Sequence, residues 1–159
     1  MDAPSSWPSR QRQRGFTLVE IMIVVVIIGL LAAIAVPAIK KVQRRSQNSR
    51  AANDIRVFAQ AFDTYAAENG GWPPNVGPGV VPAGMSGTFK TDVWVATTII
   101  GGRWNWDKNI NGITAAISIS SPTASSAQMT EIDAMIDDGD LSTGHFQFIN
   151  TRYMYILED

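Results

Sequence analysis

The stretch from Phe16 to Ile39 reads FTLVEIMIVVVIIGLLAAIAVPAI and decides the fold. Glu20 is its only charged residue, and the nineteen residues from Ile21 to Ile39 carry no charge at all. A helix needs about 20 apolar residues to cross the hydrocarbon core of a bilayer, which is about 30 Å thick. The stretch is therefore long enough to span a membrane and does not fit an ordinary globular core.

Glu20 is the one costly residue of this span. A carboxylate inside a transmembrane segment costs about 2.5–3.5 kcal/mol on insertion scales, so it needs a partner. The nearest cations in the chain are arginines that lie before Gly15. If the chain is cut after Gly15, a new ammonium group appears on Phe16, four residues or about one helical turn from Glu20. That amine, on the same chain or on a neighbour, is then the natural counter-ion.

The helical pattern continues beyond the span. Apolar residues recur at spacings of three and four, at Ile55, Phe58, Phe62 and Tyr65. This spacing indicates one face of an amphipathic helix, and Asn69-Gly70-Gly71 supplies a stop signal. We therefore predict one continuous helix over residues 16–69, with residues 16–39 as its transmembrane part.

Residues 70–159 are predicted to form a small globular, β-rich head. Short apolar and alternating runs predict strands, and Met and Ile at helical spacing predict a short helix. So small a sheet needs cover, and the stripe from Ile55 to Tyr65 is expected to supply it. The fold class is α+β, a long N-terminal helix with a small antiparallel sheet. The predicted head elements are strands at 93–100 and 113–120, a helix near 129–136 and a hairpin at 145–149 and 153–157.

Composition excludes several functions. The sequence has no Cys and a single His, His145, which excludes disulfides, thiolate metal sites and two-His zinc motifs. The formal net charge of -1 does not favour nucleic-acid binding. No nucleophile elbow, P-loop or dinucleotide fingerprint occurs, so the sequence predicts no enzyme.

The segment around Gly15 resembles the processing motif of type IV prepilins and of the pseudopilins of type II secretion systems. A basic leader ends in Gly15, Phe16 follows, and Glu20 stands four positions later at the start of a long apolar run. In that family a membrane peptidase cuts after the Gly and methylates the new Phe amine, and the Glu pairs with the amine of an adjacent subunit. The resemblance implies a leader of residues 1–15, N-methylation at Phe16 and an assembly role for Glu20.

The resemblance covers Arg14 to about Pro37, and it includes two residues that soften the helix. Gly29 and Pro37 fall where the family usually has such residues. Pro37 removes one backbone donor, so residues 29–37 are expected to be the weakest part of the helix. By resemblance it is expected to loosen when subunits pack in filaments. The missing Cys departs from many pilins and fits pseudopilins.

The family resemblance implies a filament-forming structural subunit, with a pseudopilin of a type II-like secretion system favoured. A major or minor pilin of a type IV pilus is the alternative, and a membrane-anchored periplasmic binding module that does not polymerise is a third. Expected partners are other pilin-like subunits, in a homo- or hetero-oligomeric filament, a prepilin peptidase, an inner-membrane assembly platform and the lipid bilayer. No nucleic acid is expected.

The orientation of the span rests on the same resemblance. It places the N-terminus in the cytoplasm and the head in the periplasm, as a single-pass inner-membrane protein. The basic residues that follow the span, Lys40, Lys41, Arg44 and Arg45 among them, favour the reverse orientation by count.

An ordinary secretory signal, cleaved after Ala33-Ile34-Ala35, is the competing interpretation of the N-terminal segment, but the apolar run is longer than such signals use.

One loop matches half of a calcium-binding motif. Asp107, Asn109 and Asn111, followed by Gly112, fit the pattern D-x-[DN]-x-[DN]-G. Ser118 stands where a bidentate Glu should be, and Asn-Gly between strands is also a strong hairpin signal. A turn and a calcium site both remain open here. No other cofactor is expected.

Two further groups of residues have a structural and a functional interpretation. Four aspartates near the end of the predicted short helix could hold a cation, face a basic neighbouring subunit, or lie in a solvated turn. Four tryptophans could form a stacking platform, although packing in a core or interface is the simpler interpretation. The aspartates are Asp133, Asp137, Asp138 and Asp140, and the tryptophans are Trp72, Trp94, Trp104 and Trp106.

Overall fold

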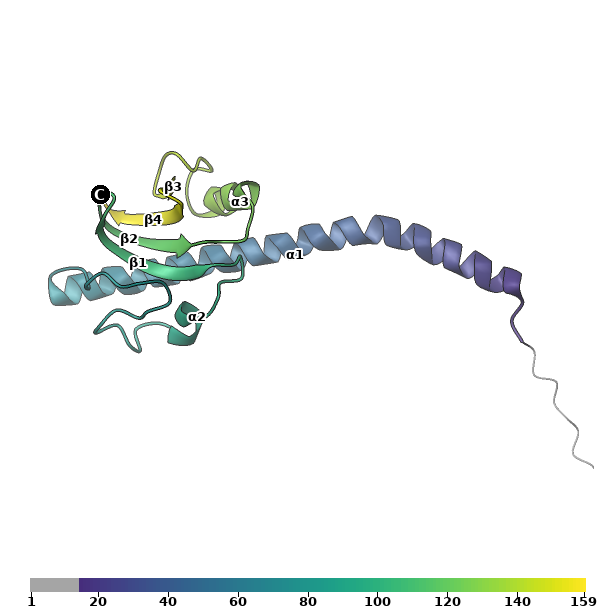
Figure 1. Ribbon diagram of the computed structural model, residues 1–159, viewed down its shortest axis with the longest axis horizontal. Helices are drawn as coiled ribbons and strands as arrows, with labels where there is room; N and C mark the ends of the chain where they lie inside the picture. Colours follow the sequence, from purple (N-terminus) through teal and green to yellow (C-terminus); the bar gives the residue numbers. More distant parts are fainter. Residues whose placement is uncertain (1–14) are drawn as a thin grey trace, which may run out of the picture. The chain divides into compact units, whose positions relative to one another are not determined.

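The structure, a computed structural model, describes residues 15–159 (Figure 1). Of the predicted leader, all but Gly15 lies outside the described residues. The chain divides after Lys40 into two compact units, so the later part of the long helix belongs with the head. The elements are α1 (Leu18–Asn69), α2 (Thr91–Val95), β1 (Arg103–Ile110), β2 (Ile113–Ser120), α3 (Ser126–Ile136), β3 (Phe146–Ile149) and β4 (Arg152–Glu158).

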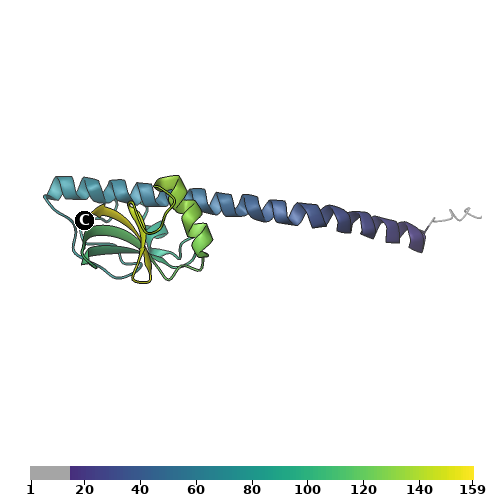
Figure 2. The same ribbon diagram turned by 90° about the horizontal axis from the view of Figure 1, so that it is seen from above.

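The four strands form one antiparallel sheet in the order β1-β2-β4-β3. Within the unit Lys41–Asp159, which we call the folded unit, the second part of α1 covers one face of this sheet (Figure 2). The α+β class, the predicted helix, the strand at 113–120, the short helix and the final hairpin are confirmed. His145, expected in that hairpin, lies one residue before β3.

Aromatic residues form the centre of the folded unit. Phe58 packs edge to face on Trp104, with ring centroids 5.1 Å apart, and Phe62 stacks on Trp106 at 3.9 Å. Trp94 joins them and is fully buried. Large rings of this kind bury much apolar area, and their specific geometry adds to it. The stripe on the helix therefore covers the sheet as predicted, and these three tryptophans are core residues.

The strand predicted at residues 93–100 is wrong. The chain forms the single helical turn of α2 at Thr91–Val95, and only Trp94 of that turn is buried. Val95 and Ile99 are exposed, so the apolar run at residues 93–100 is not a buried strand. The strand that pairs with β2 is instead β1, where Trp104 and Trp106 alternate with polar residues at the two-residue period of a strand. The polar residues between and after them, Asn105 and Asp107, are also buried, so β1 is covered on both faces there.

A two-residue turn joins β1 to β2. Asn111 and Gly112 both have positive φ, at 57° and 85°. This is the backbone that a tight hairpin with matching strand twist requires, and Asn-Gly is the preferred pair for it. The hairpin interpretation of this loop is confirmed.

Candidate functional site

The predicted cleavage point lies in accessible, non-helical chain. Gly15, Phe16 and Thr17 precede the first residue of α1, and all three are exposed. The Phe16 side chain is 84% exposed, and among the described residues no atom would lie within 4 Å of a Cβ placed on Gly15. The Gly15–Phe16 bond is thus open to cleavage, which stays a prediction.

Glu20 closes a capping box with Thr17 at the start of α1. Its Oε2 accepts hydrogen bonds from the Thr17 backbone N–H and from the Thr17 hydroxyl, both at 2.8 Å, and the Glu20 N–H donates to the Thr17 hydroxyl at 3.3 Å. These bonds satisfy donors that the first turn of a helix otherwise leaves free. Both hydrogen bonds that the described residues make to the carboxylate use Oε2, which leaves Oε1 available to a further donor among residues 15–159.

The helix that follows Glu20 exposes apolar side chains all round. Within the described residues it is the one helix that is long and apolar enough to cross a membrane, and none of its apolar window is buried in the protein. We call residues 18–39 the apolar segment. Because so much apolar surface is stable only away from water, the segment fits a membrane anchor.

The two predicted softening residues do not interrupt α1. Gly29 and Pro37 both lie inside the continuous helix Leu18–Asn69. Pro37 still lacks the donor that would bond one turn back, so the structure keeps the local weakness that the sequence predicts. Loosening in a filament stays a prediction.

After the apolar segment, polar side chains fix α1 to α3. Asn48 is fully buried; its amide donates to Glu131 at 2.7 Å and its carbonyl accepts from Gln128 at 2.9 Å. Arg44 forms a salt bridge with the same Glu131 at 2.8 Å. Arg44 thus pairs within the chain, whereas Lys40, Lys41 and Arg45 are exposed.

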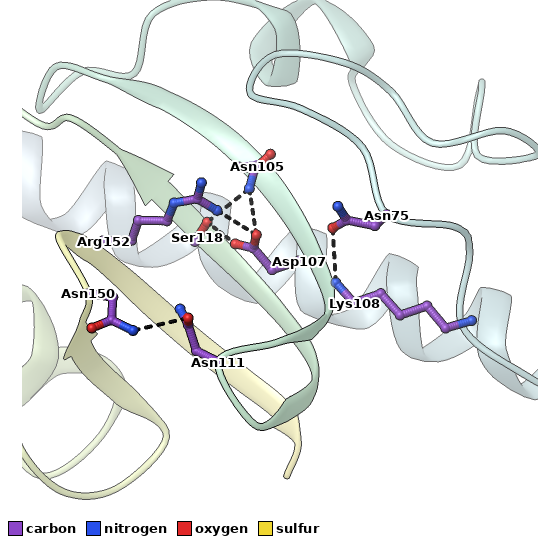
Figure 3. A network of polar contacts seen from close by, with 8 residues as sticks. All are labelled: Asn75, Asn105, Asp107, Lys108, Asn111, Ser118, Asn150 and Arg152. Atoms are coloured by element: carbon purple, nitrogen blue, oxygen red, sulfur yellow. Dashed lines mark hydrogen bonds and ion pairs between the residues drawn. The ribbon is translucent and has the colours of Figure 1, made fainter.

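The predicted calcium ligands of the β1–β2 hairpin face different partners (Figure 3). Asp107 is buried on the sheet face away from α1, where Arg152 forms a salt bridge to its Oδ1 at 2.6 Å and Ser118 donates to its Oδ2. Asn111 Oδ1 accepts from Asn150 at 3.0 Å. Asn109 is exposed. Arg152 already balances the Asp107 charge, so the arrangement does not favour a cation at this loop.

The second acidic group gathers at the C-terminal end of α3. One carboxylate oxygen from each of Asp133, Asp137 and Asp138 lies within 4.8 Å of the others. Asp133 is fully buried; the backbone N–H of Gly139 favours its charged form, but within the described residues no hydrogen bond of ordinary geometry reaches either of its oxygens. Burial, with the charges of Asp138 and Asp137 next in importance, raises the pKa of Asp133 to about 6.

Comparison with known proteins bears on the N-terminal site. The family model of the prokaryotic N-terminal methylation motif matches residues 10–36, which include Gly15, Phe16 and Glu20. The N-terminal part of the chain is therefore similar to the methylation motif of pilin-like proteins. The matched residues include the exposed junction at Gly15–Phe16 and the capping box of Thr17 and Glu20.

Several curated proteins are similar to part of this chain. The chain is 40% identical over 87 residues to fimbrial protein EcpC of Eikenella corrodens, covering 55% of the chain and 57% of that protein. It is 44% identical over 64 residues to type II secretion system core protein G of Pseudomonas aeruginosa, covering 40% and 45%. Type IV major pilin protein PilE1 of Neisseria gonorrhoeae is 34% identical over 96 residues, covering 58% and 53%.

The likeness is partial. The chain spans about half the length of the curated relatives it matches. No solved structure matches the chain significantly. The similarity thus supports the pilin-like motif and leaves the role of the whole chain to be proposed.

Sequence reasoning missed two features of these sites. The capping box was visible as Thr17 followed three residues later by Glu20, directly before an apolar run. The buried state of Asp133 was harder to foresee. The spacing of Met129, Ile132 and Ile136 marks the face of α3 that packs inward, and Asp133 follows Ile132 at the edge of that face.

Proposed function

We propose that the chain is a structural, filament-forming subunit, a pseudopilin of a type II-like secretion system. The observation that carries the proposal is the exposed junction at Gly15–Phe16, which lies within the matched N-terminal methylation motif. The capping box of Thr17 and Glu20 and the apolar helix follow this junction directly. The similarity to core protein G of type II secretion systems supports the choice of filament.

Cleavage at this junction would prepare the subunit for assembly. It frees an ammonium group on Phe16, next to Thr17, whose amide and hydroxyl already orient the Glu20 carboxylate. The Oε1 of Glu20 can then accept a hydrogen bond from the Phe16 ammonium group of a neighbouring copy. The carboxylate would balance the positive charge of that group. In a membrane such a pair removes the cost of an isolated carboxylate. The pair also fixes the register of an incoming helix.

The proposal includes location and partners. The apolar segment anchors the chain in the inner membrane, with the leader on the cytoplasmic side, where a prepilin peptidase acts, and the folded unit in the periplasm. Other pilin-like subunits and an assembly platform in the same membrane are the partners. Loosening of the helix near Gly29 and Pro37 would ease packing in the filament.

A type IV pilus subunit is the second candidate. The similarities to PilE1 and EcpC favour it, because they extend over 58% and 55% of this chain, against 40% for core protein G. The two candidates share processing and assembly and differ in the filament that results.

The test is to express the chain with a prepilin peptidase and either a type II secretion system or a type IV pilus system, and to shear and sediment filaments. We expect a mature chain that starts at Phe16 and carries one added methyl group, as read by intact mass, and that sediments with the secretion filament. Incorporation only into the pilus would favour the second candidate. A start after Ala35, or a processed chain that never sediments, would contradict a filament subunit and favour a membrane-anchored binding module.

A further inference from the structure

The turn of α1 that follows the apolar segment is strongly basic. No Asp or Glu occurs between Glu20 and Asp54, so this part of the helix supplies no negative side chain of its own. Like charges four residues apart lie on the same face of a helix and destabilise it. Negative charge from elsewhere would therefore stabilise this turn. Its cations are Lys40, Lys41, Arg44 and Arg45.

Two arginines of α1 have acidic neighbours within the chain. Arg44 forms a salt bridge with Glu131 at 2.8 Å. Arg50 lies near Asp54, about one helical turn further along. There burial raises the pKa of the Asp54 carboxyl group, and the positive charge of Arg50 counteracts that rise. The folded unit thus provides opposite charge for both of these arginines.

Lys41 and Arg45 have no such neighbour among residues 15–159. Both side chains are exposed, and the salt bridges of the described residues involve Arg44 and Arg152 instead. Lys41 and Arg45 are four residues apart, so they share one face of α1. Val42, next to Lys41 in the chain, is 66% exposed. This face therefore offers two positive charges and an apolar side chain to a partner outside the described chain.

The spacing of charges along α1 matches the dimensions of a bilayer. From Glu20 to Lys40 the helix rises by about 30 Å, which equals the thickness of the hydrocarbon core. Each headgroup layer adds about 5–8 Å, and residues 40–45 rise by about 8 Å. When the apolar segment spans a membrane, the basic turn therefore lies at the depth of the lipid headgroups.

We propose that Lys41 and Arg45 bind the phosphate groups of anionic phospholipids at one surface of the membrane. Ammonium and guanidinium groups donate charge-assisted hydrogen bonds to phosphate oxygens, and anionic lipids attract cations that adjoin a span. The long side chains let the charged ends reach the headgroups while their stems and Val42 lie against acyl chains. The exposed Lys40, next in the chain, adds to the positive charge.

A lipid fits this surface better than a second copy of the chain. A copy at the same depth in the membrane would bring the same cations to this level, and like charges repel. The acidic side chain that follows on α1, Asp54, stands about 20 Å further along the helix than Lys41. Anionic headgroups between neighbouring copies would instead remove the repulsion.

Binding at this turn would set the depth of the apolar segment. With Lys40 at one boundary of the hydrocarbon core, Glu20 is held at the other. The contact needs the membrane span alone, so it does not depend on the proposed filament.

The test measures the lipid preference of the full chain in detergent. The protein is titrated with phosphatidylglycerol, which is anionic, or with phosphatidylcholine, which is zwitterionic, and native mass spectrometry counts the bound lipids. A cation near an anionic surface strengthens binding by about fivefold, so Lys41 and Arg45 together should give a preference of about 25-fold for phosphatidylglycerol. Added salt should reduce this preference.

Matched variants locate the contact. Lys41→Gln and Arg45→Gln should each reduce the preference for phosphatidylglycerol by about fivefold, and the double variant should lose most of it. Arg50→Gln removes the same charge from an exposed position further along α1, beside Asp54, and should keep the wild-type preference. Lys41→Arg keeps the charge and should keep the preference. All of these side chains are exposed, so the melting temperatures should match that of the wild type.

Two results would overturn the proposal. One is a wild type that binds phosphatidylglycerol and phosphatidylcholine equally. The other is a double variant that keeps the preference, and if that variant also fails to sediment with filaments, the cations face an acidic protein partner instead. A wild type that prefers phosphatidylglycerol but never forms filaments would contradict the proposed function and leave the lipid contact supported.

Discussion

The two parts of α1 use apolar residues in opposite ways. In the apolar segment they surround the helix, and Ile27 is 51% exposed. In the part that belongs to the folded unit they form one stripe, and Ile55 is 1% exposed. The pattern around the helix, rather than the residue type, therefore decides the environment: an apolar surface on all sides suits lipid, and a single stripe suits a protein core.

Polar residues differ between the two parts in the same manner. The single charged residue of the apolar segment, Glu20, is satisfied by Thr17, the residue directly before α1. In the folded unit, the buried Asn48 is satisfied by α3, about eighty residues further along the chain. The first arrangement is local in the sequence, and the second makes the helix part of a tertiary structure.

The largest effect on stability is expected from truncating the aromatic stripe. Phe62→Ala removes the ring that stacks on Trp106 in the core, and should lower the free energy of unfolding of the folded unit by about 3–5 kcal/mol. Ile27→Ala in the apolar segment should change it by less than about 0.5 kcal/mol. Denaturant unfolding of both full-length variants in detergent, followed by tryptophan fluorescence, measures the difference. Equal losses would mean that the two parts of α1 are not distinct.

A smaller effect is expected from the polar contact between α1 and α3. Asn48→Ala leaves Glu131 and Gln128 without their partner and should cost about 1–3 kcal/mol in the same unfolding experiment. Asn53→Ala is the matched control on the same helix, because Asn53 is exposed, and it should be neutral or slightly stabilising. A neutral Asn48→Ala would show that the buried amide adds nothing to the docking of α3.

The sequence predicted well wherever one periodicity dominated. The uninterrupted apolar run and the stripe from Ile55 to Tyr65 predicted α1 almost to the residue, and the strict alternation from Ile113 predicted β2. It failed at residues 93–100, because a short apolar run fits a strand and a buried turn equally well. Only the packing of Trp94 against Phe58, at 5.0 Å, distinguishes the two, and that contact joins distant parts of the chain.

The candidate sites divide along similar lines. The junction at Gly15 and the position of Glu20 could be predicted because all their parts are neighbours in the sequence. The calcium motif at Asp107 was a local pattern too, but Arg152, which neutralises it, is forty-five residues away. The burial of Asp133 likewise depends on how α3 packs. Charges that are balanced by distant residues cannot be assigned from spacing alone.

The central claim is that Glu20 is retained for assembly rather than for the start of its own helix. Two variants separate these roles. Glu20→Gln keeps a hydrogen-bonding side chain of similar size and removes the charge, while Thr17→Val removes the capping hydroxyl and leaves the carboxylate. The loss of the cap costs about 1 kcal/mol locally.

The measurement is the fraction of cleaved chain that sediments as filaments, with intact mass to verify the start at Phe16. The account predicts that Glu20→Gln is inserted, cleaved and folded but forms filaments about tenfold less well or worse, the loss expected from a contact worth about 1.4 kcal/mol. Thr17→Val should assemble close to the wild-type level. Normal cleavage with wild-type filaments in Glu20→Gln, or an equal defect in Thr17→Val, would contradict the account.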